Sequence, residues 1–129
     1  MDLRFFEIYR NPEYLILLAQ GAAMSAALTV VAGLMGFVLA TGLATARFHQ
    51  VPVLGRVAAG YVEFVRNTPL IVQLFFVAFG LPQLLGYSWP FWAHALLALT
   101  LNFSAYFSEI LRAGFTTVAQ GQYEAALSL

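Results

Sequence analysis

The feature that most limits what this chain can fold into is a pair of long stretches without a charged side chain, from Tyr14 to Ala46 and from Asn67 to Ser108. A helix needs only about 20 mostly apolar residues to cross the hydrocarbon core of a bilayer. Both stretches exceed that length. Because 61% of all residues are hydrophobic and only 9% are charged, the composition departs far from that of soluble domains. The sequence therefore predicts an all-α integral membrane protein.

The first uncharged stretch predicts one membrane helix over about residues 14–46. A cleaved signal peptide is the competing interpretation, because residues 44–46 read Ala-Thr-Ala and fit a small-x-small cleavage pattern. The apolar cores of signal peptides run to about 7–15 residues and follow a positive start. This run is longer and follows a start of mixed charge, so the membrane helix is favoured.

The second uncharged stretch is too long for one helix, and its middle is rich in the turn formers glycine, proline and serine between Gly80 and Pro90. It predicts two helices, over about residues 58–81 and 91–112. Pro69 falls inside the first of these, where it removes one backbone hydrogen bond. We expect a kink there, with a neighbouring side chain satisfying the freed carbonyl.

The arginines predict how the helices are oriented, since cytoplasmic segments near membrane ends hold an excess of positive charge. Arg47, Arg56 and Arg66 surround the first connection and Arg112 follows the third helix, whereas residues 83–90 carry no charge. The N-terminal segment mixes both signs. The predicted topology has the N-terminus outside, the first connection inside, the second outside, and the tail in the cytoplasm.

A ridge of small residues follows one side of the first helix, because Ala32, Gly36, Ala40 and Ala44 recur at every fourth position. Small side chains let another backbone approach closely. The ridge predicts a packing partner for this helix.

Polar residues follow one side of the third helix, where Asn102, Tyr106 and Glu109 are spaced i, i+4 and i+7. Asn102 falls near the middle of the bilayer, where an unpaired amide is costly. We expect it to face protein or a water-filled path. Two interpretations stay open: the stripe lines a substrate route, or it holds the bundle together through interhelical hydrogen bonds.

Further polar residues suggest structural contacts within single helices. Glu109 with Arg112, and Glu63 with Arg66, are spaced for ion pairs three residues apart. Gln73 follows Pro69 by one turn and could either contact substrate or fill the kink. The candidate substrate path therefore consists of Gln73, Asn102 and Tyr106.

Several classes of chemistry find no support in the sequence. With no cysteine there are no disulfides or thiolate ligands, and His49 and His94 lack partners at metal-ligand spacing, so we predict no metal site and no catalytic group. The chain has no lysine and no phosphate-binding Gly-x-x-x-x-Gly-Lys loop. Any ATP hydrolysis would belong to a partner. A net charge of zero gives no reason to expect nucleic acid binding.

The last residues, Gly121 to Leu129, are helix-prone and follow a glycine break. Ala125 and Ala126 are small enough for a close fit against another protein surface. A cytoplasmic amphipathic helix lying on the membrane would explain the same segment.

Three segments resemble one protein family in the right order. Residues 61–82 (YVEFVRNTPLIVQLFFVAFGLP) and 101–114 (LNFSAYFSEILRAG) resemble successive helices of permease subunits in the polar amino acid branch of ATP-binding cassette (ABC) importers. Residues 118–129 resemble the start of the cytoplasmic EAA loop of that superfamily. Glu124, Ala125 and Ala126 stand at the positions that give the loop its name.

The resemblance implies a type I ABC importer fold, in which residues 1–129 form part of one transmembrane permease domain in the inner membrane of a prokaryote. It implies four kinds of partner: a second permease subunit, ABC ATPase subunits, an extracytoplasmic solute-binding protein, and a polar amino acid as substrate. Segment 113–129 would be the coupling segment, with Gly121, Glu124, Ala125 and Ala126 as contact residues. We expect the chain to be a fragment that lacks further C-terminal helices.

Two alternatives to an amino acid permease stay open on the sequence. The first is a permease of the same superfamily for another small solute, such as a quaternary amine or an opine. The second is a small helical membrane anchor or channel protein.

Overall fold

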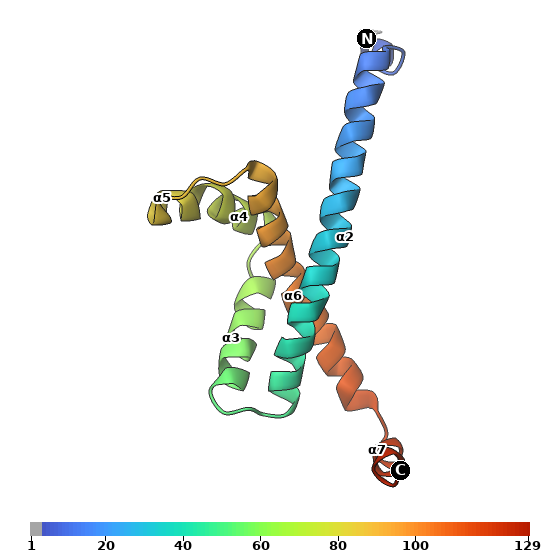
Figure 1. The fold of residues 1–129 in the computed structure, drawn as a ribbon, viewed down its shortest axis with the longest axis vertical. Coiled ribbons are helices and arrows are strands. Elements are labelled where there is room, and N and C mark those ends of the chain that lie inside the picture. Colours follow the sequence, from blue (N-terminus) through green and yellow to red (C-terminus); the bar gives the residue numbers. More distant parts are fainter. Residues whose placement is uncertain (1–3) are drawn as a thin grey trace.

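The computed structural model describes residues 4–129, and every regular element in that range is helical, as predicted (Figure 1). The first three residues, part of the N-terminal segment of mixed charge, lie outside the described range. The helices are α1 (Arg4–Glu7), α2 (Pro12–Phe48), α3 (Leu54–Arg66), α4 (Leu70–Phe75), a π-helical turn η1 (Phe76–Gly80), α5 (Leu81–Leu85), α6 (Phe91–Thr117) and α7 (Gln120–Leu127).

Helix α2 matches the predicted first helix to within two residues at each end. Asn11 caps its start, because the side-chain oxygen accepts a hydrogen bond of 3.1 Å from the Glu13 N–H. At 37 residues the helix is about 55 Å long, well beyond the thickness of a hydrocarbon core. Of its most apolar stretch of 18 residues, only 11% is buried. A long, apolar and exposed helix is suited to lipid rather than to a protein core.

Hydropathy supports the other two predicted spans less clearly. Within residues 4–129, α2 alone is long and apolar enough to cross a membrane by itself. Helix α3 and the segment Leu70–Leu85 are long and apolar enough to cross a membrane only if the two together form one bent span. Helix α6 has 27 residues but carries polar side chains along its length. Length and composition therefore leave the three-span topology a prediction.

The expectation of one kinked helix over residues 58–81 is wrong, because the helix is interrupted at Pro69 and two separate helices form on either side of it. Helix α3 ends at Arg66, and the axis turns by 105° before the segment Leu70–Leu85. Pro69 takes an extended ψ of 140°, and a proline also disfavours the helical conformation of the residue before it. The helical arm then continues through Gly80 and Pro82, although the sequence predicts a turn there. It ends at Gly86, whose φ of 67° is left-handed.

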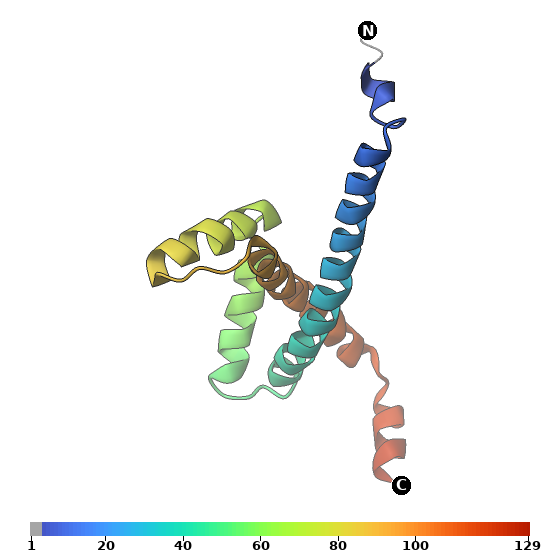
Figure 2. The same ribbon diagram turned by 45° about the horizontal axis from the view of Figure 1, so that its top comes forward.

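Two views show how the helices are arranged (Figures 1 and 2). Helix α3 runs back beside the end of α2, α6 crosses α2, and the arm formed by α4, η1 and α5 projects sideways. The α2–α3 connection and α7 lie toward the same end of the molecule, opposite the N-terminal end. The predicted topology requires this arrangement of the first connection and the tail.

The small-residue ridge of α2 packs against α6, so the prediction of a packing partner is confirmed. Ala32, Ala40 and Ala44 are fully buried, and Gly36 is buried between them. A Cβ atom built on Gly36 would lie 2.8 Å from the Cβ of Phe103 and 3.2 Å from the backbone nitrogen of Ser104. The close approach of the two backbones depends on the missing side chain at Gly36.

Candidate functional site

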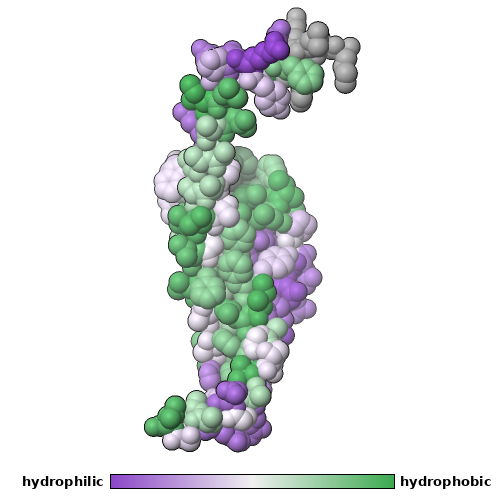
Figure 3. All heavy atoms as spheres, turned by 90° about the vertical axis from the view of Figure 1, so that its right-hand side faces the viewer, coloured by the Kyte–Doolittle hydropathy of each residue, from purple (hydrophilic) through white to green (hydrophobic). Residues whose placement is uncertain are grey.

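A polar groove of about 420 Å³ opens between α3 and α6, just below the break at Pro69. Figure 3 shows hydrophilic surface gathered along one edge of the helical body, beside a hydrophobic face. The polar lining residues of the groove are Arg47, Glu63, Arg66, Asn67, Tyr106 and Glu109. The groove thus brings together side chains from α2, α3 and α6.

Glu109 joins these three helices through one carboxylate. Its Oε2 lies 2.9 Å from Nη1 of Arg47 and 3.9 Å from Nη1 of Arg66, and its Oε1 lies 2.7 Å from Nη2 of Arg112. Arg47 and Glu109 are 62 positions apart, which is why no local spacing rule indicated their contact.

The ion pair between Glu109 and Arg112 is present in the structure, but the one expected between Glu63 and Arg66 is not. Arg66 turns toward Glu109 instead, and its guanidinium carbon lies 5.9 Å from the centre of the Tyr106 ring. The Tyr106 hydroxyl donates a hydrogen bond of 3.3 Å to the carbonyl of Arg66. Within residues 4–129, Glu63 therefore faces the groove without an ion pair.

The side chain of Gln73 bonds to backbone carbonyls at the helix break around Pro69. Its Nε2 donates hydrogen bonds of 2.9 Å to the carbonyls of Val65 and Thr68. The Val65 carbonyl is the one that the missing N–H of Pro69 would have bonded in an unbroken helix. Of the two roles that the sequence left open for Gln73, the contacts support filling the kink.

Asn102, on α6, forms a hydrogen bond with the side chain of Gln73. Its Nδ2 donates a hydrogen bond of 3.3 Å to Oε1 of Gln73, and Asn102 is only 7% exposed. The expectation that it faces the interior is confirmed, and the contact favours interhelical bonding over direct substrate contact. Tyr106, 43% exposed, is the member of the predicted substrate path that lines the groove.

Two further polar side chains make contacts that the sequence did not indicate. The Tyr61 hydroxyl lies 3.0 Å from the carbonyl of Leu101 and 2.9 Å from Oγ of Ser104, joining α3 to α6. A tyrosine in an amphipathic helix gave no signal for this contact. His94 is 4% exposed and stacks on Tyr87, with the ring centres 5.7 Å apart.

The predicted coupling residues lie on α7, which is separated from α6 by the extended residues Val118 and Ala119. Gly121, Glu124, Ala125 and Ala126 are all exposed. Gln120 Nε2 donates a hydrogen bond of 3.0 Å to Oε1 of Glu124. The helix therefore presents its two alanines on an open surface.

Asn102→Leu should loosen the arm that begins at Pro69, because Gln73 loses its support from α6. One lost interhelical hydrogen bond predicts a fall in stability of about 0.6–2 kcal/mol. Thermal unfolding in detergent and limited proteolysis of residues 67–85 would measure it. Gln83→Leu, on the exposed part of α5, is the matched control and should change neither. Unchanged stability and unchanged cleavage in Asn102→Leu would contradict this interhelical role of the amide.

Known proteins share this helical arrangement and sequence. The family described as binding-protein-dependent transport system inner membrane component matches residues 36–129. The arginine transport system permease protein ArtQ of Bacillus subtilis (strain 168) is 41% identical over 111 residues, covering 85% of this chain and 50% of ArtQ. The nopaline transport system permease protein NocM of Agrobacterium fabrum is 40% identical over 103 residues, covering 72% of this chain and 42% of NocM.

A solved structure extends the match to the fold. A chain in the crystal structure of an amino acid ABC transporter with histidines superposes with a TM-score of 0.85 at 35% identity, covering 99% of this chain and 58% of that one. The helices thus have the fold of a type I ABC importer permease. The chain belongs to the family of binding-protein-dependent transport system inner membrane components, which confirms the resemblance. It spans about half the length of the curated relatives it matches.

Proposed function

We propose that this chain is part of the permease subunit of an ATP-driven importer for polar amino acids. The observation that carries the proposal is its similarity, over 85% of its length, to a permease named for arginine transport. The amino acid transporter structure with the same helical arrangement supports the same solute class. An opine is the second candidate substrate, because the nopaline permease is almost equally similar.

In this role the groove between α3 and α6 contributes part of the solute path. Tyr106 and Glu63 face it with polar groups that the described contacts leave partly free, while Arg66 lies against Tyr106 at the break. A charged or zwitterionic solute needs such polar groups to replace its water inside the bilayer. Gln73 and Asn102 act on the path indirectly by fixing the angle of the arm.

The orientation follows from the arginines, with the α2–α3 connection and α7 in the cytoplasm and the N-terminus outside. The common end of the molecule that these two segments occupy supports this orientation. Helix α7 would then contact an ABC ATPase through Glu124, Ala125 and Ala126. A second permease subunit and an extracytoplasmic solute-binding protein complete the proposed assembly, and ATP is hydrolysed by the partner.

Ala125→Trp or Ala126→Trp should weaken the contact with the ATPase, because added bulk in a close interface costs typically about 1–3 kcal/mol. Copurification of the ATPase with the permease from membranes, together with solute-stimulated ATP hydrolysis, measures the effect. Val38→Trp is the matched control, since Val38 is 71% exposed on apolar α2. Equal recovery and equal stimulation in all three variants would contradict the assignment of α7 as the coupling helix.

A further inference from the structure

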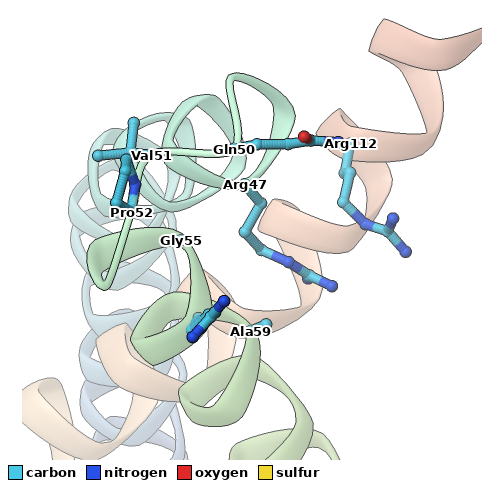
Figure 4. A pocket seen from close by; sticks show the side chains of 8 residues that line it. Arg47, Gln50, Val51, Pro52, Gly55, Ala59 and Arg112 are labelled. Carbon is cyan, nitrogen blue, oxygen red and sulfur yellow. The ribbon is translucent and has the colours of Figure 1, made fainter.

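A second hollow, of about 500 Å³, lies at the α2–α3 connection and is lined by three arginines, one from each of three helices. Arg47 comes from the end of α2, Arg56 from the first turn of α3, and Arg112 from α6. Figure 4 shows Arg47 reaching across the hollow between Gln50 and Ala59, with Arg112 on the side of α6. Among the described residues, no acidic side chain lines it.

The positive charge of this hollow is only partly neutralised. Glu109 pairs with Arg47 and Arg112 from the neighbouring groove, and one carboxylate leaves a surplus of positive charge on the pair. Arg56 makes no ion pair within residues 4–129. The Nε of Arg112 is buried and has no hydrogen-bond partner among the described residues. A buried donor without an acceptor calls for one from outside these residues.

The backbone beside the hollow forms a closed turn. Helix α3 starts there with no side-chain cap, but backbone carbonyls already accept from its first N–H groups, and the Gly55 N–H donates to the carbonyl of Val51 at 2.8 Å. The connection is tight, because Val53 adopts a φ of 65° and the Leu54 N–H bonds the carbonyl of Pro52 at 2.7 Å. Gly55 lets this turn pack close to α2, since an added Cβ would meet the carbonyl oxygen of Ala46 at 3.1 Å.

Exposed apolar side chains lie on either side of Arg56 along α3, where Leu54 and Val57 line a separate, apolar hollow. Val53, Leu54 and Val57 adjoin Arg56 in sequence and are 72%, 58% and 62% exposed. The arginine-lined hollow lies at the end of apolar α2, which the orientation proposed above, on which this inference rests, places at the cytoplasmic headgroups. Basic pockets between membrane helices on the cytoplasmic side bind anionic headgroups, and arginine pairs with phosphate through parallel hydrogen bonds.

We propose that the hollow formed by Arg47, Arg56 and Arg112 binds the phosphate group of an anionic phospholipid of the cytoplasmic leaflet. Arg56 supplies the main donors to the phosphate, with the side chain of Arg112, which is 41% exposed, beside it, and the acyl chains lie along the exposed side chains of Leu54 and Val57. The site adjoins the solute groove, with which it shares Arg47, and does not depend on which solute is carried.

The test uses the protein produced from its whole gene and purified in neutral detergent. Its thermal midpoint, and the lipid retained in native mass spectra, are measured with dioctanoylphosphatidylglycerol, with dioctanoylphosphatidylcholine and with inorganic phosphate. The phosphatidylglycerol should raise the midpoint and stay bound, and the other two should not. An equal effect of phosphatidylcholine, or of inorganic phosphate alone, would overturn the assignment of an anionic lipid.

Arg56→Gln should weaken phosphatidylglycerol binding about fivefold, the equivalent of about 1 kcal/mol for one basic residue near the membrane surface. Arg56 has no ion pair within residues 4–129 to lose, so the variant should fold like the wild type. Arg10→Gln, in the turn before α2 at the opposite end of the molecule, is the matched control and should bind as the wild type does. Unchanged binding in Arg56→Gln, or an equal loss in Arg10→Gln, would refute the site.

Discussion

Gly36→Val is expected to force α2 and α6 apart and to lower the stability of the folded chain by about 1–3 kcal/mol, the typical effect of overpacking a close contact. The first added atom would already lie 2.8 Å from Cβ of Phe103 and 3.2 Å from the carbonyl oxygen of Thr100. Backbone and Cβ atoms cannot turn aside as the end of a flexible side chain can. The two helices must therefore separate.

The same helix provides the controls for this change. Cβ atoms built on Gly33 or Gly42 would meet nothing within 4 Å, so Gly33→Val and Gly42→Val should leave stability unchanged or raise it slightly, since valine has the higher helix propensity. Thermal unfolding in one detergent, followed by circular dichroism, compares the three variants. Equal midpoints for all three would show that α2 and α6 do not pack through this ridge.

Glu109→Gln should have the second large effect, because it removes the carboxylate that holds Arg47, Arg66 and Arg112 together. The side chain of Glu109 is 26% exposed and that of Arg47 17% exposed. We expect a loss of about 2 kcal/mol, between the small value of exposed ion pairs and the larger penalty for breaking buried ones. Mutual repulsion of the three arginines should also loosen the ends of α2 and α3.

Glu63→Gln is the matched control, because Glu63 lines the same groove without an ion pair within residues 4–129. It changes the net charge by the same amount but should leave stability within about 0.5 kcal/mol, as for most exposed substitutions. Chemical unfolding in detergent, with hydrogen exchange of residues 47–56, measures both variants. A loss in Glu63→Gln as large as that in Glu109→Gln would show that net charge, rather than the three-helix contact, sets the stability.

The sequence predicted those features of the fold that arise from local patterns. The uncharged run defined α2, and four small residues at a spacing of four identified the face that packs on α6. Pro69 marked the change of direction, but its size did not follow, because a proline only removes a hydrogen bond and restricts its predecessor. The 105° turn needs the surroundings that hold it, here Gln73 and Asn102.

The candidate site was harder to predict, because its contacts join residues far apart in the chain. The spacing of Glu109 and Arg112 indicated their pair, whereas the same spacing of Glu63 and Arg66 misled, because Arg66 finds a better-placed carboxylate on α6. In the sequence, Arg47 indicated only how the membrane helices are oriented. Its place between two polar hollows follows from the short connection that folds α3 back on α2.

The central claim, ATP-driven import of a polar amino acid, is tested most directly by uptake into proteoliposomes. They should contain the permease from its whole gene with its ATPase, ATP enclosed and the solute-binding protein outside, and receive labelled arginine, glutamine, histidine, nopaline or leucine in turn. We predict accumulation of at least one of the three polar amino acids that requires ATP, and none of leucine. Accumulation of nopaline alone would favour the opine permease, and uptake that is the same with and without ATP would contradict the account.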